Sequence, residues 1–83
     1  MEEKLIGKIA HYFGKISVAI VELSGALKVG DRVHIKGSST DFEQDISSIQ
    51  IEHENVEKAK KGDAVGIKVD EKVRESDEVY LIL

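Results

Sequence analysis

The chain has 83 residues, a formal net charge of −4 and no cysteine, so disulfides and thiolate-based zinc sites are excluded. The negative balance opposes general binding to nucleic acid, and no apolar run reaches the roughly eighteen residues of a membrane span. Ten isoleucines and nine valines outnumber five leucines, and β-branched residues favour strands over helices. The composition predicts one all-β domain over residues 1–83. The N-terminal segment "MEEKLIGKI" lacks a positive region followed by an apolar stretch, so we expect no signal peptide and a cytoplasmic location.

The first two predicted strands flank a short turn. Residues 4–12 form the first strand, and the pair Gly14-Lys15 allows a reversal. Residues 16–23 form the second strand, which is apolar on both faces. This strand is either buried on both faces or presents one apolar face outward. If the barrel leaves that face uncovered, a protein partner or a second copy would bury the row of Ile16, Val18 and Ile20.

Two of the four aromatic side chains are adjacent at the end of the first strand. Strict alternation places Phe13 on the same face as Ile9 and His11, and Tyr12 on the opposite face. We expect Phe13 to pack in the core and Tyr12 to be the better candidate for a surface platform.

The later strands follow at short, regular spacing. In the segment 42–52 the inward phase changes between Ile46 and Ile49, which predicts a bulge or bend near Ser47-Ser48. The polar segment 53–63 is expected to contain one helical turn at most. The remaining strands are predicted at 32–37, 42–52, 64–69 and 79–83, and about six strands of this size favour a small closed barrel.

A Gly-Asp pair precedes two of these strands. The segments 27–35 and 59–69 share this pair, and 74–82 is a degraded copy in which Ser76 replaces the glycine. Glycine tolerates positive φ, and an aspartate side chain can bond nearby backbone N–H groups, which favours a structural role over a catalytic one. The predicted structural turn residues are Gly30, Asp31, Gly62 and Asp63.

The order of "IGKIAHY", "LKVGDRVHIKG", "ISSIQIEHENVEKAKKGDAVGIKV" and "ESDEVYLI" resembles the second domain of translational GTPases of the elongation factor Tu type. This resemblance implies a closed, six- or seven-stranded antiparallel β-barrel that does no chemistry and binds tRNA, ribosomal RNA or protein. The chain has no GxxxxGK[ST] loop, so it does not hydrolyse nucleotides. A weaker resemblance is to the C-terminal barrel of collagenase-like peptidases, which would make the chain an accessory module for a peptidase-type partner.

A set of cations and an aromatic ring is the predicted RNA-binding face, because stacking on bases requires rings beside cations. The set consists of Lys8, His11, Tyr12, Lys15, Arg32, His34 and Lys36. The three histidines lack the HxH or HxxxH spacing of a metal site, so neither a metal nor a cofactor is predicted.

The sequence therefore predicts a non-enzymatic binding module that contacts tRNA, ribosomal RNA or a ribosome-associated protein. The acidic balance favours an alternative, in which the second strand forms a protein interface or a homodimer and RNA is not bound. The accessory peptidase module is a further alternative.

Overall fold

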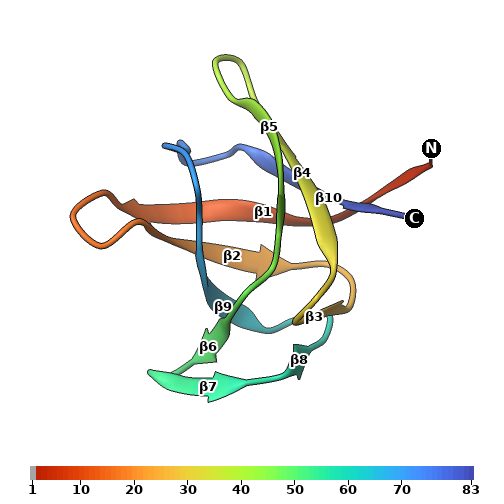
Figure 1. The fold of residues 1–83 in the computed structure, drawn as a ribbon, viewed down its shortest axis with the longest axis vertical. Helices are drawn as coiled ribbons and strands as arrows, with labels where there is room; N and C mark the ends of the chain where they lie inside the picture. The colour runs from red at the N-terminus through yellow and green to blue at the C-terminus, as the bar shows by residue number, and fades with distance from the viewer. Residues whose placement is uncertain (1) are drawn as a thin grey trace.

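The computed structural model describes residues 2–83, and every regular element in that range is a strand (Figure 1). No helix in this range has the length and apolar character that a membrane crossing needs. The strands are β1 (Glu3–Phe13), β2 (Val18–Leu23), β3 (Leu27–Lys28), β4 (Arg32–Lys36), β5 (Asp41–Asp45), β6 (Ile49–Ile51), β7 (Glu54–Val56), β8 (Lys58–Ala59), β9 (Ala64–Lys68) and β10 (Glu78–Ile82).

Eight strands form one antiparallel sheet in the order β5-β4-β10-β1-β2-β9-β6-β7, and β3 pairs with β8 in a second, small sheet. Figure 1 shows β4 and β5 crossing over β1 and β2. The ends of the large sheet, β5 and β7, are not joined by a backbone ladder. The prediction of an all-β antiparallel fold is confirmed. The predicted count of six or seven strands is too low, because short strands lie in segments interpreted as loops.

Alternation builds the core. Val33 and Ile35 of β4 and Val65 and Ile67 of β9 are buried, while their neighbours in sequence are less buried or exposed. The buried apolar side chains form one cluster. The prediction of one domain over residues 1–83 stays a prediction, and Met1 lies outside the described residues.

The polar segment 53–63 contains two short strands, and the prediction of a helical turn is wrong. Val56 of β7 pairs with Ile49, and Ala59 of β8 pairs with Leu27. Each of these apolar residues belongs to a different strand, so their spacing of three does not report a helix.

A β-bulge in β1 reverses the predicted facing of the adjacent aromatic residues. The β1–β2 ladder shifts register between Ile9 and His11, so Ala10 is an extra residue in β1. Tyr12 consequently packs against the core, and the Phe13 side chain is 46% exposed. The expectation of a packed Phe13 and an outward Tyr12 is wrong, because a period of two does not continue through a bulge.

The predicted break in the segment 42–52 is confirmed. β5 ends at Asp45 and β6 begins at Ile49, and the side chains of both Ile46 and Ile49 are buried. Between these strands the chain passes from β5, at one end of the large sheet, to β6 and β7, at the other end.

The buried side chain of Gln44 links the edge strand β5 to the end of β9. Its Nε2 donates to the carbonyl oxygen of Lys68 at 2.8 Å, and its Oε1 accepts from the N–H of Asp70 at 2.8 Å. The amide therefore joins two strands that no backbone ladder joins.

The two Gly-Asp turns and the degraded third copy have one structure. In each turn the aspartate carboxylate accepts from the backbone N–H three residues earlier, at 3.0 Å for Asp31, 3.0 Å for Asp63 and 2.8 Å for Asp77. The residue before the aspartate has a positive φ, 97° at Gly30 and 95° at Gly62. The carboxylates thereby close the turns that precede β4, β9 and β10.

Ser76 occupies the third of these left-handed positions, with a φ of 75°. A side chain at this position costs about 1 kcal/mol. Glycine removes that cost but gives the unfolded chain more conformational freedom, so Ser76→Gly is expected to raise the free energy of unfolding by about 0.5 kcal/mol. Urea denaturation measures this change. Ser39→Gly, at an exposed loop position without positive φ, is the control and is expected to give no gain. A less stable Ser76→Gly protein would contradict the prediction.

Candidate functional site

The residues predicted to bind RNA lie on separate parts of the sheet. Arg32, His34 and Lys36 are on β4, whereas Lys8 is on β1. β10 lies between these strands, and its Glu78 pairs with both Lys8 and Lys36. The C-terminal strand is thus inserted between β1 and β4, so Lys8 and the β4 cations do not lie on neighbouring strands.

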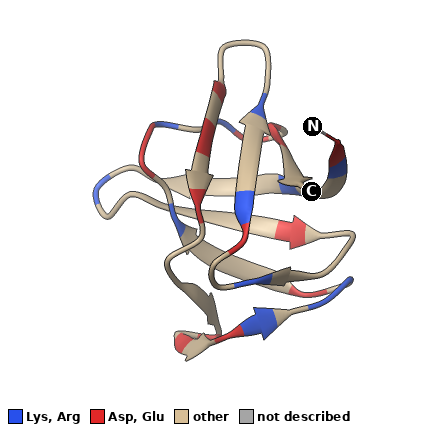
Figure 2. Cartoon of the chain, turned by 45° about the vertical axis from the view of Figure 1, so that its right-hand side comes forward, with Lys and Arg blue, Asp and Glu red and all other residues tan. Residues whose placement is uncertain are grey.

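Carboxylates occupy the strand next to the β4 cations (Figure 2). Arg32 donates from Nη1 to Asp45 at 3.0 Å and from Nε to Glu43 at 3.3 Å. The hydrogen bond to Asp45, and then that to Glu43, raises the pKa of Arg32 above its ordinary value. A phosphate would have to displace both carboxylates, so this face does not favour a polyanion.

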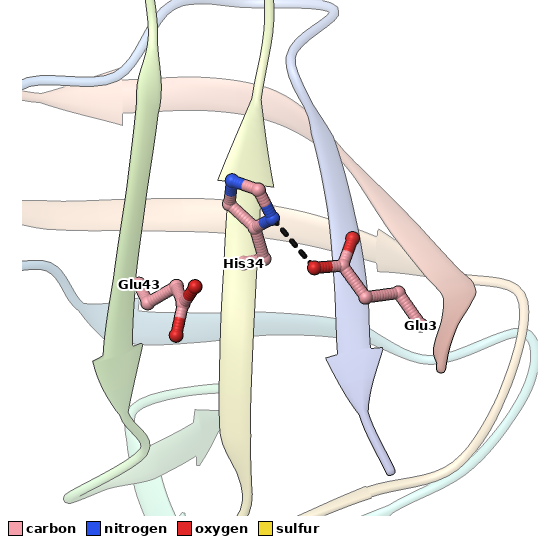
Figure 3. A group of neighbouring side chains, drawn as sticks. All are labelled: Glu3, His34 and Glu43. Carbon is pink, nitrogen blue, oxygen red and sulfur yellow. Dashed lines mark hydrogen bonds and ion pairs between the residues drawn. The ribbon is translucent and has the colours of Figure 1, made fainter. Parts of the chain in front are cut away.

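His34 contacts two carboxylates, those of Glu3 and Asp41, and Figure 3 shows the contact with Glu3. Its Nδ1 is 2.8 Å from Oε2 of Glu3, which reaches across β10, and its Nε2 is 2.5 Å from Oδ1 of Asp41. The Asp41 hydrogen bond is the largest cause that raises the pKa of His34, and Glu3 adds to it against an opposing effect of burial. The imidazolium form is therefore favoured by the fold.

Within residues 2–83, one group of ligand-type side chains is close enough to hold a cation. Ligand atoms of Glu3, His34 and Glu43 lie within 4.8 Å of one another (Figure 3). A metal would require a neutral imidazole with a free nitrogen. Both ring nitrogens of His34 instead face carboxylates, and Glu43 accepts from Arg32. The cluster is satisfied as a network of ion pairs, and we assign no metal to it.

The stability of the fold is expected to depend on pH through His34. A histidine whose pKa is higher in the folded state stabilises the fold fully below its unfolded pKa, about 6.5, and loses that contribution as pH rises through the folded pKa. We expect the difference in Tm between wild type and His34→Gln to shrink from about pH 5.5 to about pH 9. The ion pairs of His34 should contribute roughly 1 kcal/mol at most to the free energy of unfolding. His53→Gln is the matched control, and its Tm should depend on pH in the same way as that of wild type. Parallel profiles for wild type and His34→Gln would contradict the prediction.

Two other members of the predicted RNA set have partners within the chain. Nδ1 of His11 is 3.4 Å from Oε2 of Glu75, and the ring of His11 meets that of Phe13 at 4.5 Å between centroids. Nζ of Lys36 lies 5.5 Å from the centroid of the Tyr80 ring. These contacts engage both side chains without nucleic acid.

The last three members also lie apart from the β4 face. Lys8 and Lys15 are exposed and form no ion pair within residues 2–83, and Tyr12 packs against the core. The structure therefore does not bring the seven residues together on one surface. RNA binding by this set stays a prediction.

An apolar groove, here called the hairpin groove, opens beside the turn between β1 and β2. Its volume is about 230 Å³, and its first wall includes Phe13 and Ile16, which are 46% and 61% exposed. The outward row predicted from the second strand is thus left uncovered. The lining consists of Phe13, Ile16, Val18 and Ile20 on one side, Gln50, Glu52 and His53 on the other, and Ala64 and Gly66 between them.

Sequence reasoning missed part of this groove and the buried amide of Gln44. Gln44 falls on the inward phase between Phe42 and Ile46, and that alternation was the available signal. Glu52 and His53 form the two-residue turn between β6 and β7, but a Glu-His pair is not a typical hairpin turn signal. No local pattern pointed to this turn.

Comparison with known proteins gives relatives that are much longer than this chain. An uncharacterized protease of Methanocaldococcus jannaschii is 46% identical over 78 residues, which cover 93% of this chain and 19% of that protein. A collagenase of Porphyromonas gingivalis is 41% identical over 81 residues, which cover 95% of this chain and 22% of the collagenase. The chain spans about a fifth of the length of these curated relatives.

Solved structures show the same fold. The C-terminal domain of a Geobacillus thermoleovorans protein assigned to the U32 peptidases superposes with a TM-score of 0.91 at 20% identity, covering 96% of this chain and 93% of that domain. At this identity the likeness shows the fold alone. A family model described as Elongation factor Tu domain 2 matches residues 14–75, which is 62 of the 83 residues. The chain therefore belongs to the elongation factor Tu domain 2 family.

Proposed function

We propose that the chain is a non-catalytic accessory module for a U32-type peptidase body, either in the same polypeptide or as a separate partner. One observation carries this proposal. Nearly the whole chain matches about a fifth of the length of a protein named a protease and of a protein named a collagenase. In those proteins a module of this kind accompanies a much larger body. We assign any peptide-bond chemistry to that body.

The charges of the module support a non-catalytic role. Arg32, His34 and Tyr80 have shifted pKa values, and all three lie on the outward face of β4 and β10, away from the hairpin groove. A catalytic acid or base is expected inside a concave site that holds a substrate. The groove and the shifted groups are thus on different surfaces.

We also infer that the module works as a closed barrel, as its family membership implies. Besides the Gln44 bridge, the N–H of Gly30 donates to the carbonyl of Ile46 at 2.8 Å, and the N–H of Val29 donates to the carbonyl of Glu57 at 2.8 Å. These bonds support closure of the sheet through the β3–β8 pair. Slow hydrogen exchange at Gly30 is the expected signature.

The end of the module that carries both termini is the best candidate for contact with the peptidase body. The N–H of Leu83 donates to the carbonyl of Glu2 at 2.9 Å, so the termini lie side by side, opposite the first hairpin (Figure 1). Leu83 is 63% exposed and Leu5 is 45% exposed. In the Geobacillus protein the similar domain is C-terminal, so the rest of that protein precedes it.

A chimera tests the proposed function. In the Methanocaldococcus jannaschii relative, the matched segment is replaced by this chain or deleted, and hydrolysis of fluorogenic gelatin is measured. We expect the chimera to keep the parent activity, the deletion to lose about tenfold or more, and the isolated chain to show none. Full activity of the deletion, or activity of the isolated chain, would refute the proposal.

The surface near the termini has its own control. Leu83→Ser and Leu5→Ser in the chimera are expected to weaken its activity or thermal stability. Val29→Ser alters an apolar side chain that is similarly exposed, at 42%, and is expected to leave both unchanged. Equal effects at all three positions would refute this placement of the contact.

Binding in a translation context is the second candidate, and membership of the elongation factor Tu domain 2 family is the observation that favours it. The acidic strand β5 beside the β4 cations opposes it. An NMR titration with tRNA at low and near-physiological salt tests it. Salt-sensitive shifts at Arg32, His34 and Lys36 would support it, and unchanged spectra at low salt would exclude it.

A further inference from the structure

The floor of the hairpin groove is a hollow at Gly66. Across the sheet Gly66 pairs with Ile20 on one side and with Gln50 on the other. A Cβ added at Gly66 would meet Cγ1 of Val18 at 3.5 Å and Cδ1 of Ile20 at 3.6 Å, which are ordinary contacts. Neither packing nor positive φ therefore requires glycine in this strand, although glycine weakens a strand. A missing side chain at such a position marks a place where another group can approach closely.

The rim of the groove carries backbone strain. Glu52 and His53 have φ values of 51° and 68°, in the left-handed region that hairpin turns usually fill with Asn or Gly. Each non-glycine residue there costs roughly 1 kcal/mol. The turn nevertheless holds a carboxylate and an imidazole at the mouth of the groove.

The two sides of the groove are complementary to each other. The hairpin side presents Phe13 and Ile16, with Lys15 between them in sequence, and Lys15 forms no ion pair within the described chain. Glu52 lines the opposite side of the same groove as the hollow at Gly66. A second copy related by a two-fold rotation would therefore present an apolar side chain to the hollow at Gly66. It would also present the cation of Lys15 to the carboxylate of Glu52.

We propose that the hairpin groove is a self-association surface that takes the first hairpin of a second copy of this chain. Ile16 of each copy enters the hollow at Gly66 of the other, and Lys15 of each copy pairs with Glu52 of the other. A contact of this kind is isologous and closes as a dimer. The proposal does not depend on the peptidase module, whose contact we place at the opposite end of the molecule.

The dimensions of the groove favour a protein side chain over a small molecule. Its volume of about 230 Å³ is below the range of roughly 300–1,000 Å³ of ligand pockets. One hairpin on each side gives a small interface, so we expect a dissociation constant on the order of 100 µM.

Sedimentation equilibrium of the chain tests the proposal. Concentrations from about 10 µM to about 1 mM bracket the dissociation constant expected for a small interface. We expect a monomer–dimer equilibrium that Gly66→Val weakens about tenfold, because the new side chain fills the hollow. Valine favours strands, so the Tm of this variant should equal or exceed that of wild type. A wild-type chain that stays monomeric throughout, or a Gly66→Val chain that associates like wild type, overturns the proposal.

Charge reversal identifies the contact between copies. Lys15→Glu and Glu52→Lys are each expected to weaken association about fivefold, and the double variant to restore it within about twofold. Lys72→Glu, an exposed reversal outside the groove, is the control and should leave association unchanged. Absence of rescue in the double variant overturns the assigned pair. The wild-type chain could instead stay monomeric while the groove variants weaken the activity of the peptidase chimera. That result would reject the second copy and assign the groove to the peptidase body.

Discussion

Replacing Gly37 with alanine is expected to lower the free energy of unfolding by about 3 kcal/mol, because the new methyl group collides with a buried carboxylate. An added Cβ would lie 2.6 Å from Cγ of Asp77 and would overlap its Oδ1. Asp77 is 4% exposed, and its Oδ2 accepts from the N–H of Arg74 at 2.8 Å in the turn before β10. Relief of the collision would break this bond, in a fold whose total stability is expected to be only about 5–15 kcal/mol.

Urea denaturation at neutral pH measures this loss. Gly14→Ala is the matched control, because a Cβ at Gly14 has no contact shorter than 3.5 Å, and its effect should stay within about 0.5 kcal/mol. The collision also predicts non-additivity: in an Asp77→Ala background, Gly37→Ala should cost much less than in wild type. Equal costs in both backgrounds would show that the carboxylate is not the cause.

The change Gln44→Leu is expected to lower the free energy of unfolding by about 2 kcal/mol, because it leaves two backbone groups without their partner. Leucine retains the bulk of the side chain but neither accepts from the N–H of Asp70 nor donates to the carbonyl of Lys68. The two strands that this amide joins are not otherwise paired. The loss should therefore appear first as faster hydrogen exchange at Asp70.

Gln50→Leu is the control for this change. Gln50 is exposed, and its Nε2 donates only to the side chain of Asn55 at 3.2 Å, so its replacement should cost less than about 0.5 kcal/mol. A Gln44→Leu protein as stable as wild type, or equal losses at the two positions, would refute the bridging role.

Local patterns predicted the parts of the fold whose causes are local. Period-two alternation identified β4 and β9, since Val33, Ile35, Val65 and Ile67 need only a strand with one buried face. The shift of phase between Ile46 and Ile49 likewise required a break. The pattern failed for Tyr12 and Phe13, because the bulge at Ala10 depends on the register with β2 and leaves no mark in the alternation.

The candidate site divides in the same way. The sequence identified the row of Ile16, Val18 and Ile20 as apolar but left open whether the barrel covers it, and only the structure shows that the row lines an open groove. The far rim with Glu52 was not identified, because it comes from the turn between β6 and β7, and these strands approach the first hairpin only through β9. The pairing of Arg32 with Asp45 was also missed, because it depends on the register of the β4–β5 hairpin, in which these two residues lie directly opposite each other.

The all-β class, most of the strands and the repeated Gly-Asp turns could be predicted from the sequence, because each rests on residues a few positions apart. The family resemblance could be predicted as well, from the order of these motifs along nearly the whole chain. The tertiary structure alone decided which strands are neighbours. Placing β10 between β1 and β4 separated the predicted RNA residues, and placing β9 between β2 and β6 created the groove. Strand order is set by the burial of the whole core, a free energy that no short segment contains.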